Sequence, residues 1–297
     1  MADQKCAFVA ILGAPNVGKS TLLNQVIGNK ISIVSPKVQT TRGKVRGIYT
    51  KDNTQLILVD TAGIFKPSRR LDRAMVSGAW TESNDADMRL VLIDAVKGID
   101  KNTSIVIQNL DKSKQKAILV INKIDDVKTD KLALLGAECS KSPVWQDIFY
   151  ISAKTGKGVS ELMDYLTQKA PHAPWLFSDD EMTDMPDRLF AAEITREKLF
   201  MNLQDELPYH LTVETTSFKE ADQSIRIEQN IIVERPAHRI IVLGRNGQMI
   251  KKIGQQSRIE LTKQLGKKVH LFLFVKVREN WTEDPKQYKR WGLDFNA

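Results

Sequence analysis

The segment Gly13–Ser20, which reads G-A-P-N-V-G-K-S, constrains the fold of this chain more than any other feature. It fits the pattern G-x-x-x-x-G-K-[ST], whose glycines let the backbone curl so that successive N–H groups point at one phosphate group. An apolar stretch at 7–12 precedes it and a helical stretch at 21–27 follows it, which is the strand–loop–helix context that the motif requires. The sequence therefore predicts that a nucleoside triphosphate binds at the beginning of this helix, where the helix dipole is positive.

The loop supplies side chains as well as backbone groups. Lys19 can reach the β- and γ-phosphates, and the Ser20 hydroxyl can ligate Mg2+. We expect nucleotide contacts along the whole loop and at the residue after it: Gly13, Ala14, Pro15, Asn16, Val17, Gly18, Lys19, Ser20 and Thr21.

The 297 residues suggest two domains, each with its own core. In the first half, apolar runs at 7–12, 56–59, 89–93 and 117–121 alternate with turn residues and helical stretches. This pattern predicts an α/β fold with a doubly wound parallel sheet, whose ligand lies at the carboxyl ends of the strands. We assign 1–172 to the nucleotide-binding domain, 173–186 to a linker and 187–297 to a smaller α+β domain with a C-terminal tail.

The second half has a different order of elements. A helical face over 188–207 is followed by strands near 210–216 and 224–234. A short helix then leads into Gly244–Gly247, one or two helices span 248–265, and a final strand covers 269–275.

Composition excludes several classes of protein. No apolar run approaches the roughly 18 residues of a membrane span. The apolar run near the N-terminus leads directly into the phosphate loop and no small-residue cleavage site precedes it, which argues against a signal peptide. Cys6 and Cys139 lack metal-ligand spacing and are expected to be reduced thiols. We therefore expect a cytoplasmic protein.

A second nucleotide motif, Asp60-Thr61-Ala62-Gly63, follows the apolar run at 56–59. An acidic residue at the end of a strand can hold Mg2+ through water, and the Gly63 N–H can meet a γ-phosphate. We expect nucleotide contacts from these four residues and from Ile64.

Base recognition is expected from Asn122, Lys123 and Asp125, which follow the apolar run at 117–121. The Asp125 carboxylate can accept both guanine N1–H and the exocyclic amine, whereas adenine would leave it unpaired. The sequence thus favours GTP over ATP and argues against a motor-type ATPase. The weaker pattern Ser152-Ala153-Lys154 would place backbone N–H groups near guanine O6.

A switch region is expected at Val38–Gly43. One of its threonines should ligate Mg2+ when the γ-phosphate is present and release it after hydrolysis. Thr40 and Thr41 are both candidates, and we favour Thr41. The metal ligands would then be Ser20, Thr41 and Asp60.

In this order, the motifs GAPNVGKST, QTTR, DTAG, NKID and SAK resemble those of translation-factor-type GTPases related to the Era family. The resemblance covers nearly the whole chain, since 193–199 and 206–209 look like the start of that family's C-terminal KH domain. Ala62 departs from it, because relatives often have proline there. The resemblance implies a GTPase that binds 16S-type small-subunit ribosomal RNA near its 3′ end and assists assembly and maturation of the 30S subunit.

Catalysis is expected from Lys19, Thr41 and Gly63. Many GTPases carry a water-orienting glutamine where this chain has Ile64, so intrinsic hydrolysis should be slow. Asn16 resembles the asparagine that helps some relatives hold a monovalent cation. We therefore add Asn16 to the catalytic residues and K+ as a possible cofactor beside Mg2+.

Glu260 is the single acidic residue among eleven Lys and Arg residues from 235 to 278, which favours a polyanionic partner. Within this block, Gly244-x-x-Gly247 has the position of the KH loop that clamps a single-stranded backbone, here of type II. We expect RNA contacts from Gly244, Arg245, Asn246, Gly247, Lys251, Lys252 and Arg258, with Lys267 and Lys268 nearby.

Two sets of apolar residues in the second domain are ambiguous. The isoleucines at 240, 241, 250 and 253 fit either the core or a platform for bases, and we favour the core. Trp281, Tyr288 and Trp291 fit either base stacking or the packing of a final helix onto the KH core, and we favour packing.

The preferred interpretation is a monomeric GTP-dependent switch that controls an RNA-binding domain. One alternative is a GTPase that acts in RNA modification, although no reactive cysteine or cofactor motif is visible in the C-terminal half. The other is a KH adaptor that holds nucleotide as a static ligand. The resemblance also allows a peripheral pool at the inner membrane, for which the chain shows basic surface and no anchor.

Overall fold

The computed structural model describes residues 4–37 and 39–297, so Val38 of the predicted switch region lies outside the described residues. The chain divides into two compact units. The first contains the described residues up to Ser32, Thr41–Asp184 and Tyr288–Ala297, and the second contains Met185–Gln287 and the described residues of the segment Ile33–Thr40.

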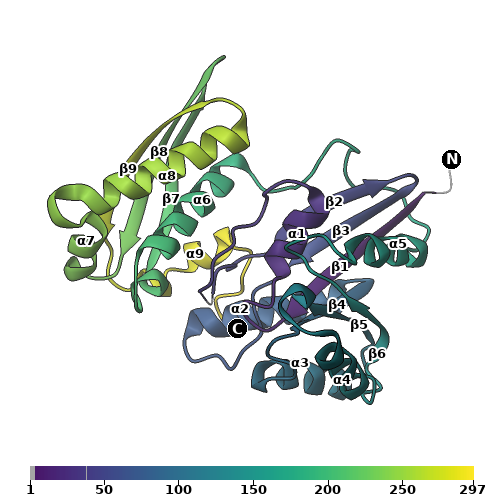
Figure 1. Cartoon of the computed structure of the whole chain (residues 1–297). Coiled ribbons are helices and arrows are strands. Elements are labelled where there is room, and N and C mark those ends of the chain that lie inside the picture. The colour runs from purple at the N-terminus through teal and green to yellow at the C-terminus, as the bar shows by residue number, and fades with distance from the viewer. Residues whose placement is uncertain (1–3, 38) are drawn as a thin grey trace. The chain divides into compact units, whose positions relative to one another are not determined.

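The first unit is built on a six-stranded sheet of order β2-β3-β1-β4-β5-β6 (Figure 1). Five strands are parallel to their neighbours, namely β1 (Lys5–Gly13), β3 (Thr54–Asp60), β4 (Met88–Asp94), β5 (Ala117–Asn122) and β6 (Trp145–Tyr150). The predicted parallel strands are confirmed. The sheet is nevertheless mixed, because β2 (Val45–Lys51) pairs with β3 in the antiparallel direction.

Five helices connect or follow these strands: α1 (Lys19–Ile27), α2 (Arg70–Asp85), α3 (Lys101–Lys112), α4 (Thr129–Cys139) and α5 (Val159–Lys169). β3 and β5 are buried along their whole length, which explains their continuous apolar sequences. β1 lies inside the sheet, with β3 on one side of it and β4 on the other, so the connections after β1 and β3 lead to opposite sides. The loop after β1 therefore lies at the topological switch point, where ligands of such sheets bind.

The second unit begins with α6 (Asp187–Asn202) and continues through β7 (Leu211–Glu220), β8 (Ser224–Val233), α7 (Pro236–Leu243), α8 (Gln248–Leu265) and β9 (Lys268–Val277). β7 and β8 are antiparallel, β8 and β9 are parallel, and the sheet order is β7-β8-β9. α6 and α8 lie along this sheet (Figure 1). The α-β-β-α-α-β order predicted from the sequence is confirmed.

The last helix, α9 (Pro285–Arg290), crosses from the second unit to the first. Trp281 is fully buried in the second unit, where its indole N–H donates to the His210 carbonyl. Tyr288 and Trp291 belong to the first unit. The expectation that all three aromatic residues pack on the core of the second domain is therefore wrong for Tyr288 and Trp291, because the chain returns to the first unit at residue 288.

Cys6 and Cys139 are both free and buried. In the ranges 4–37 and 39–297, none of the helices has the length and apolar character needed to cross a membrane.

Candidate functional site

The phosphate loop joins β1 to α1, and its glycines are required by close approaches as well as by backbone angles. A Cβ atom on Gly13 (φ 145°) would lie 2.5 Å from the Leu92 carbonyl oxygen, and one on Gly18 (φ 103°) would lie 2.2 Å from the Asn122 Nδ2 atom. Any larger residue would push the loop away from β4 or β5. The loop is thus fixed by the strands that flank it.

Lys19 begins α1 and its side chain turns back into the loop. Its ammonium donates to the carbonyl oxygens of Gly13 (3.1 Å) and Ala14 (3.0 Å), and the residue is only 6% exposed. Burial lowers the pKa of Lys19 to about 8, against the opposing attraction of the Asp60 carboxylate. The Lys19 ammonium is thus held beside the backbone of the phosphate loop, where it would attract phosphate oxygens.

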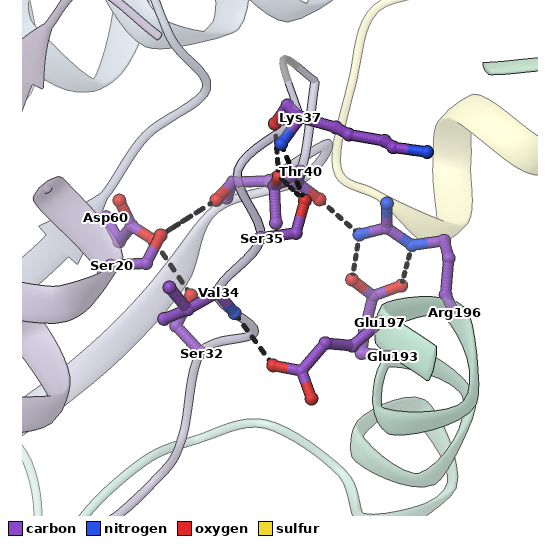
Figure 2. A network of polar contacts seen from close by, with 11 residues as sticks. Ser20, Ser32, Val34, Ser35, Lys37, Thr40, Asp60, Glu193, Arg196 and Glu197 are labelled. Carbon is purple, nitrogen blue, oxygen red and sulfur yellow. Dashed lines mark hydrogen bonds and ion pairs between the residues drawn. The ribbon is translucent and has the colours of Figure 1, made fainter. Parts of the chain in front are cut away.

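Hydroxyl groups from three segments of the first unit converge on Asp60 at the end of β3 (Figure 2). Its Oδ2 atom accepts hydrogen bonds from Ser20 (2.6 Å), Ser32 (2.9 Å) and Thr41 (3.3 Å), and the Ser20 and Thr41 hydroxyls are 3.1 Å apart. The three predicted metal ligands are thus brought together. Ser32 joins them from a loop that no sequence motif marks.

The donor set of this cluster fits Mg2+. Its groups are hydroxyl and carboxylate oxygens, which hard divalent cations prefer. The Asp60 Oδ1 atom is buried and has no hydrogen-bond partner among the residues that the structure describes. Burial raises the pKa of Asp60, while Lys19 and the three hydroxyls act in the opposite direction. A nearby divalent cation would favour the ionised carboxylate and occupy its second oxygen.

The segment after Asp60 packs directly against the phosphate loop. A Cβ atom on Gly63 would lie 2.9 Å from Pro15 atoms, and the Ile64 N–H donates to the Gly13 carbonyl at 3.0 Å. The Ile64 side chain is fully buried in the core cluster that contains Leu12 and Val91. Ile64 therefore contributes backbone near the loop, and its side chain is directed into the core.

Asn122, at the end of β5, connects two loops. Its Nδ2 donates to the Val17 carbonyl at 2.8 Å, and its Oδ1 accepts from the Ala153 N–H at 2.9 Å. The Lys123 ammonium donates to the Asn16 carbonyl (2.9 Å) and pairs with Asp94 (2.7 Å). Asp94 ends β4 and was not predicted as a site residue. These contacts attach the expected base-recognition residues to the phosphate loop.

Asp125 is exposed in the short 3-10 turn Ile124–Asp126. A hydrogen bond from the Ser152 side chain is the main cause that lowers the pKa of Asp125. Ser152 and Ala153 are buried, and Lys154 is exposed. Asp125 is thus held as an accessible, ionised carboxylate beside the Ser152–Lys154 loop, in the state that guanine recognition would need.

The two threonines of the predicted switch region lie in different surroundings. Thr41 contributes its hydroxyl to the Asp60 cluster, whereas the Thr40 hydroxyl donates to the Lys37 carbonyl (2.7 Å) and lies 2.9 Å from the Ser35 hydroxyl (Figure 2). Of the two candidates, Thr41 is the one whose oxygen faces the other expected metal ligands.

In the second unit, the segment Ile33–Thr40 is held by α6. The Val34 N–H donates to Glu197 Oε1 at 2.9 Å, and Arg196 donates to the Thr40 carbonyl while it pairs with Glu193 (Figure 2). Ile33 is buried in a core cluster that includes Ile194. Arg196 and Glu197 are only 1% and 2% exposed. The described residues of Ile33–Thr40, which include Gln39 and Thr40 of the predicted switch region, are thus an integral part of the second unit.

The predicted RNA-binding loop forms a short 3-10 turn, Arg245–Gly247, between α7 and α8. Gly244 (φ 72°) and Gly247 (φ 73°) have backbone angles that L-residues rarely adopt, and a Cβ on Gly244 would lie 2.6 Å from Met249. The side chains of Arg245, Asn246, Lys251, Lys252 and Arg258 are all exposed. The basic groups expected to contact RNA thus gather around this turn and along α8.

The isoleucines near this loop divide into two groups. Ile253 is fully buried and Ile250 is partly buried, as expected of core residues. Ile240 and Ile241 are 71% and 53% exposed, so the preference for the core is wrong for these two. They lie at the end of α7, where the 3.6-residue period turns only Val242 inward. An apolar surface therefore adjoins the Gly244–Gly247 turn.

Comparison with known proteins agrees with this arrangement. Residues 8–123 match the family model described as 50S ribosome-binding GTPase, and residues 206–282 match the KH domain model. The GTPase Era of Mesorhizobium japonicum is 51% identical over 97% of this chain and 93% of its own length. That of Afipia carboxidovorans is also 51% identical, over 98% of this chain and 95% of its own length.

Two solved structures resemble the whole fold. One is Era in complex with MgGDPNP and nucleotides 1506–1542 of 16S ribosomal RNA, and the other is an Aquifex aeolicus Era variant bound to GDP and AlF4−. Each has a TM-score of 0.92 and 39% identity, and each match covers 97% of this chain and 99% of the other. This chain matches the models of a GTPase domain and a KH domain, and it is 51% identical to a GTPase Era over nearly its whole length. It therefore belongs to the GTPase Era family.

Proposed function

We propose that this chain is a GTP-hydrolysing switch that binds small-subunit ribosomal RNA near its 3′ end and assists assembly of the 30S subunit. The observation that carries the proposal is the different surroundings of two adjacent residues, Thr40 and Thr41. Thr41 contributes to the Asp60 cluster of the first unit, and the preceding residue, Thr40, belongs to the second unit, where Arg196 holds its carbonyl. The nucleotide-binding domain is then the first unit and the RNA-binding domain is the second.

Phosphate binding is assigned to the Lys19 ammonium and to the backbone N–H groups of Gly13–Thr21 other than Pro15, which has no N–H. The Gly63 N–H would meet the γ-phosphate, which the packing of Gly63 on Pro15 supports. Guanine specificity is assigned to Asp125, supported by the loop contacts of Asn122, Lys123 and Ala153.

Mg2+ would be held by Ser20, Thr41 and Asp60. When bound, it neutralises charge on the β- and γ-phosphates. The protein's contribution is to hold the ligands in place: Ser32 and Ser20 orient the Asp60 carboxylate, and the burial of Asp60 keeps its field from being screened by water.

Intrinsic hydrolysis is expected to be slow. The Ile64 side chain has no polar group and is fully buried in the core, so it cannot orient the attacking water. The residues present can bind and position the γ-phosphate, and they can stabilise the negative charge of the transition state for its transfer. Water must then be ordered by backbone groups, by a cation or by a partner.

K+ is proposed as an accelerating cation through Asn16, whose left-handed backbone (φ 64°) lies within the phosphate loop. Turnover should be faster in K+ than in Na+ at equal ionic strength, and Asn16→Ala should abolish the difference. Equal turnover in the two salts, or an unchanged K+ response in the variant, would reject this role.

Coupling between nucleotide and RNA would act through the switch segment. Thr41 would be fixed in the GTP state as a metal ligand, and it directly follows a segment in which Glu197 and Arg196 of α6 hold Val34 and Thr40. After hydrolysis Thr41 would no longer be held, so α6 would retain contacts with Val34 and Thr40 while the neighbouring Thr41 could move. RNA would contact the Gly244–Gly247 turn and the exposed bases of α8.

The test measures steady-state GTP turnover with and without 30S subunits. It also measures the affinity for a 3′-terminal 16S RNA fragment in the presence of GDP or a non-hydrolysable GTP analogue. We expect slow turnover that rises with 30S subunits, and RNA affinity that differs between the two nucleotides. The double variant Lys251→Ala/Lys252→Ala should weaken RNA binding and reduce its salt dependence, whereas the matched control Lys112→Ala/Lys114→Ala, on α3 and the loop after it, should change neither.

The same measurements separate the alternatives. No turnover in either condition would favour an adaptor with a static nucleotide, and equal RNA affinity with both nucleotides would reject the switch. Crosslinks spread over messenger or transfer RNA in cells would reject the ribosomal assignment and favour a role in RNA modification. A cytoplasmic location, a monomeric state and a peripheral membrane pool stay predictions, for which cell fractionation, light scattering and vesicle flotation are the direct tests.

A further inference from the structure

The last ten residues of the chain, Tyr288–Ala297, form a tail that belongs to the first unit. Three aromatic residues give it an internal core: the Tyr288 ring lies 5.0 Å from that of Phe295 and 6.4 Å from that of Trp291, measured between centroids. Tyr288 is fully buried and Trp291 is 9% exposed. A polar, short C-terminal segment is therefore anchored by its aromatic side chains.

One side of the tail contacts the residues that directly follow Thr41. The Arg42 guanidinium lies over the Trp291 ring at 5.4 Å from its centroid, and Arg42 is 1% exposed. A Cβ atom on Gly43 would lie 2.6 Å from the Trp291 carbonyl oxygen and 3.1 Å from the Trp291 Cα atom. Residue 43 must therefore be glycine for the tail to lie this close to the backbone of the switch region.

The other side of the tail contacts α2, the helix that follows the Asp60–Gly63 motif. The Arg70 guanidinium lies 4.4 Å from the Phe295 ring centroid, and its Nη1 atom donates to the Phe295 carbonyl at 3.4 Å. A Cβ atom on Gly78 would lie 3.0 Å from the Leu293 side chain. Small and cationic groups on α2 thus match the aromatic and aliphatic groups of the tail.

The contacts of the tail with the switch region and with α2 both border one hollow. Its lining includes Arg42 from the switch region, Ala62 from the motif after β3, Gly78 from α2 and Leu293 from the tail. The residues between Thr41 and the start of β2 at Val45 form no helix or strand of their own, so side-chain contacts must hold them, and Lys44 does so by pairing with Glu82 of α2. Trp291 supplies such contacts at Arg42 and Gly43.

We propose that the C-terminal tail is a positioning element of the nucleotide site. Trp291 fixes Arg42 and Gly43, and this holds the adjacent Thr41 hydroxyl within the Ser20–Asp60 cluster, while Phe295 and Leu293 attach the same tail to α2. The inference rests on the proposed role of Thr41 as a Mg2+ ligand in the GTP state. Trp291 acts through Arg42 and Gly43 and is therefore a positioning residue.

The experiment compares full-length Trp291→Ala and Trp291→Phe with the unmodified chain. It measures the Mg2+ concentration that gives half-maximal GTP turnover, and the ratio of the affinities for a GTP analogue and for GDP. Trp291→Ala should raise the Mg2+ requirement by at least about fivefold and lower the preference for the GTP analogue by a similar factor, with little change in GDP affinity, because GDP does not need Thr41. Trp291→Phe should retain most of the function, since a phenyl ring can still lie under Arg42.

Lys289→Ala is the matched control, because Lys289 is an exposed residue between the two aromatic anchors. Gly43→Ala and Phe295→Ala probe the two sides of the tail independently and replace Trp291→Ala if that variant fails to fold. They should shift the Mg2+ requirement in the same direction as Trp291→Ala, and Lys289→Ala should not.

Thr41→Ala tests the assignment of Thr41 as a metal ligand separately from the positioning role of the tail. If Thr41→Ala raises the Mg2+ requirement and Trp291→Ala, Gly43→Ala and Phe295→Ala do not, the tail has no positioning role and only stabilises the fold. If Thr41→Ala itself leaves the Mg2+ requirement unchanged, the assignment of the metal ligands is wrong. A variant that lowers the unfolding temperature while the Mg2+ requirement and the GTP:GDP ratio stay constant also contradicts the positioning role.

Discussion

The Nδ2 atom of Asn122 lies 2.2 Å from the point that a Cβ atom on residue 18 would occupy. The same amide donates to the Val17 carbonyl, so the residue that supports the base-recognition loop also supports the phosphate loop. The expected base-recognition loop and the phosphate loop are therefore connected through one side chain.

Gly18→Ala should weaken nucleotide binding more than it weakens the fold. The added methyl group displaces Asn122 and forces a residue with φ 103° into a strained backbone, so we expect GTP affinity to fall by at least about tenfold. Gly28→Ala is the control at the other end of α1, where φ is 74° and no atom lies within 4 Å of the added Cβ. It should cost about 1 kcal/mol of stability and leave affinity unchanged. Fluorescent nucleotide titration and thermal unfolding measure the two effects; equal affinity losses would contradict the link.

Asp125→Asn should exchange guanine for xanthine specificity. The carboxylate is expected to accept two hydrogen bonds from guanine, and an amide can accept only through one atom and donates through the other. GTP affinity should fall by about 100-fold or more, and XTP, whose base carries an oxygen in place of the amine, should bind better than GTP. Competition titrations with both nucleotides test this. Asp126→Asn, at the exposed neighbouring position, should bind GTP normally.

Lys19 predicts opposite pH effects on binding and on stability. Its pKa of about 8 in the folded chain lies below the usual 10.5, so above about pH 8 the folded protein loses a proton that the unfolded chain keeps. Phosphates bind the protonated form, so GTP affinity should fall as pH rises through about 8. The nucleotide-free protein should become more stable over the same range, because the unfolded state there binds more protons. Titrations and unfolding curves from about pH 7 to about pH 9 test both signs, and Lys19→Met should remove both dependences.

Two isoleucines of the second unit should respond differently to truncation. Ile253→Ala removes a fully buried side chain and should cost about 2–5 kcal/mol of stability. Ile241→Ser changes a side chain that is 53% exposed, so stability should change by about 0.5 kcal/mol or less while RNA affinity falls severalfold. Thermal unfolding and RNA titration of both variants separate core from contact surface. Unchanged RNA affinity in Ile241→Ser would remove this residue from the interface.

The strands that carry the nucleotide motifs were predictable because they are buried on both faces. Their apolar runs are continuous, and each motif follows such a run at the carboxyl end of the strand. β2 was not predicted, because Val45–Lys51 alternates charged, small and apolar residues at the edge of the sheet and gives no continuous run. Ser32 and Asp94 were not predicted for another reason: their partners, Asp60 and Lys123, lie 28 and 29 residues away in the sequence, and neither residue is part of a spaced motif.

The sequence by itself determined that the chain has a GTPase domain and indicated which residues its nucleotide site should contain, because the residues of each motif are adjacent in the chain. It also determined the order of elements in both domains. Only the tertiary structure decided where Ile33–Thr40 and Tyr288–Ala297 belong, which of Thr40 and Thr41 faces Asp60, and that Ile240 and Ile241 are exposed. These outcomes depend on packing between segments far apart in the sequence, and the free energy of such packing leaves no local pattern in either segment.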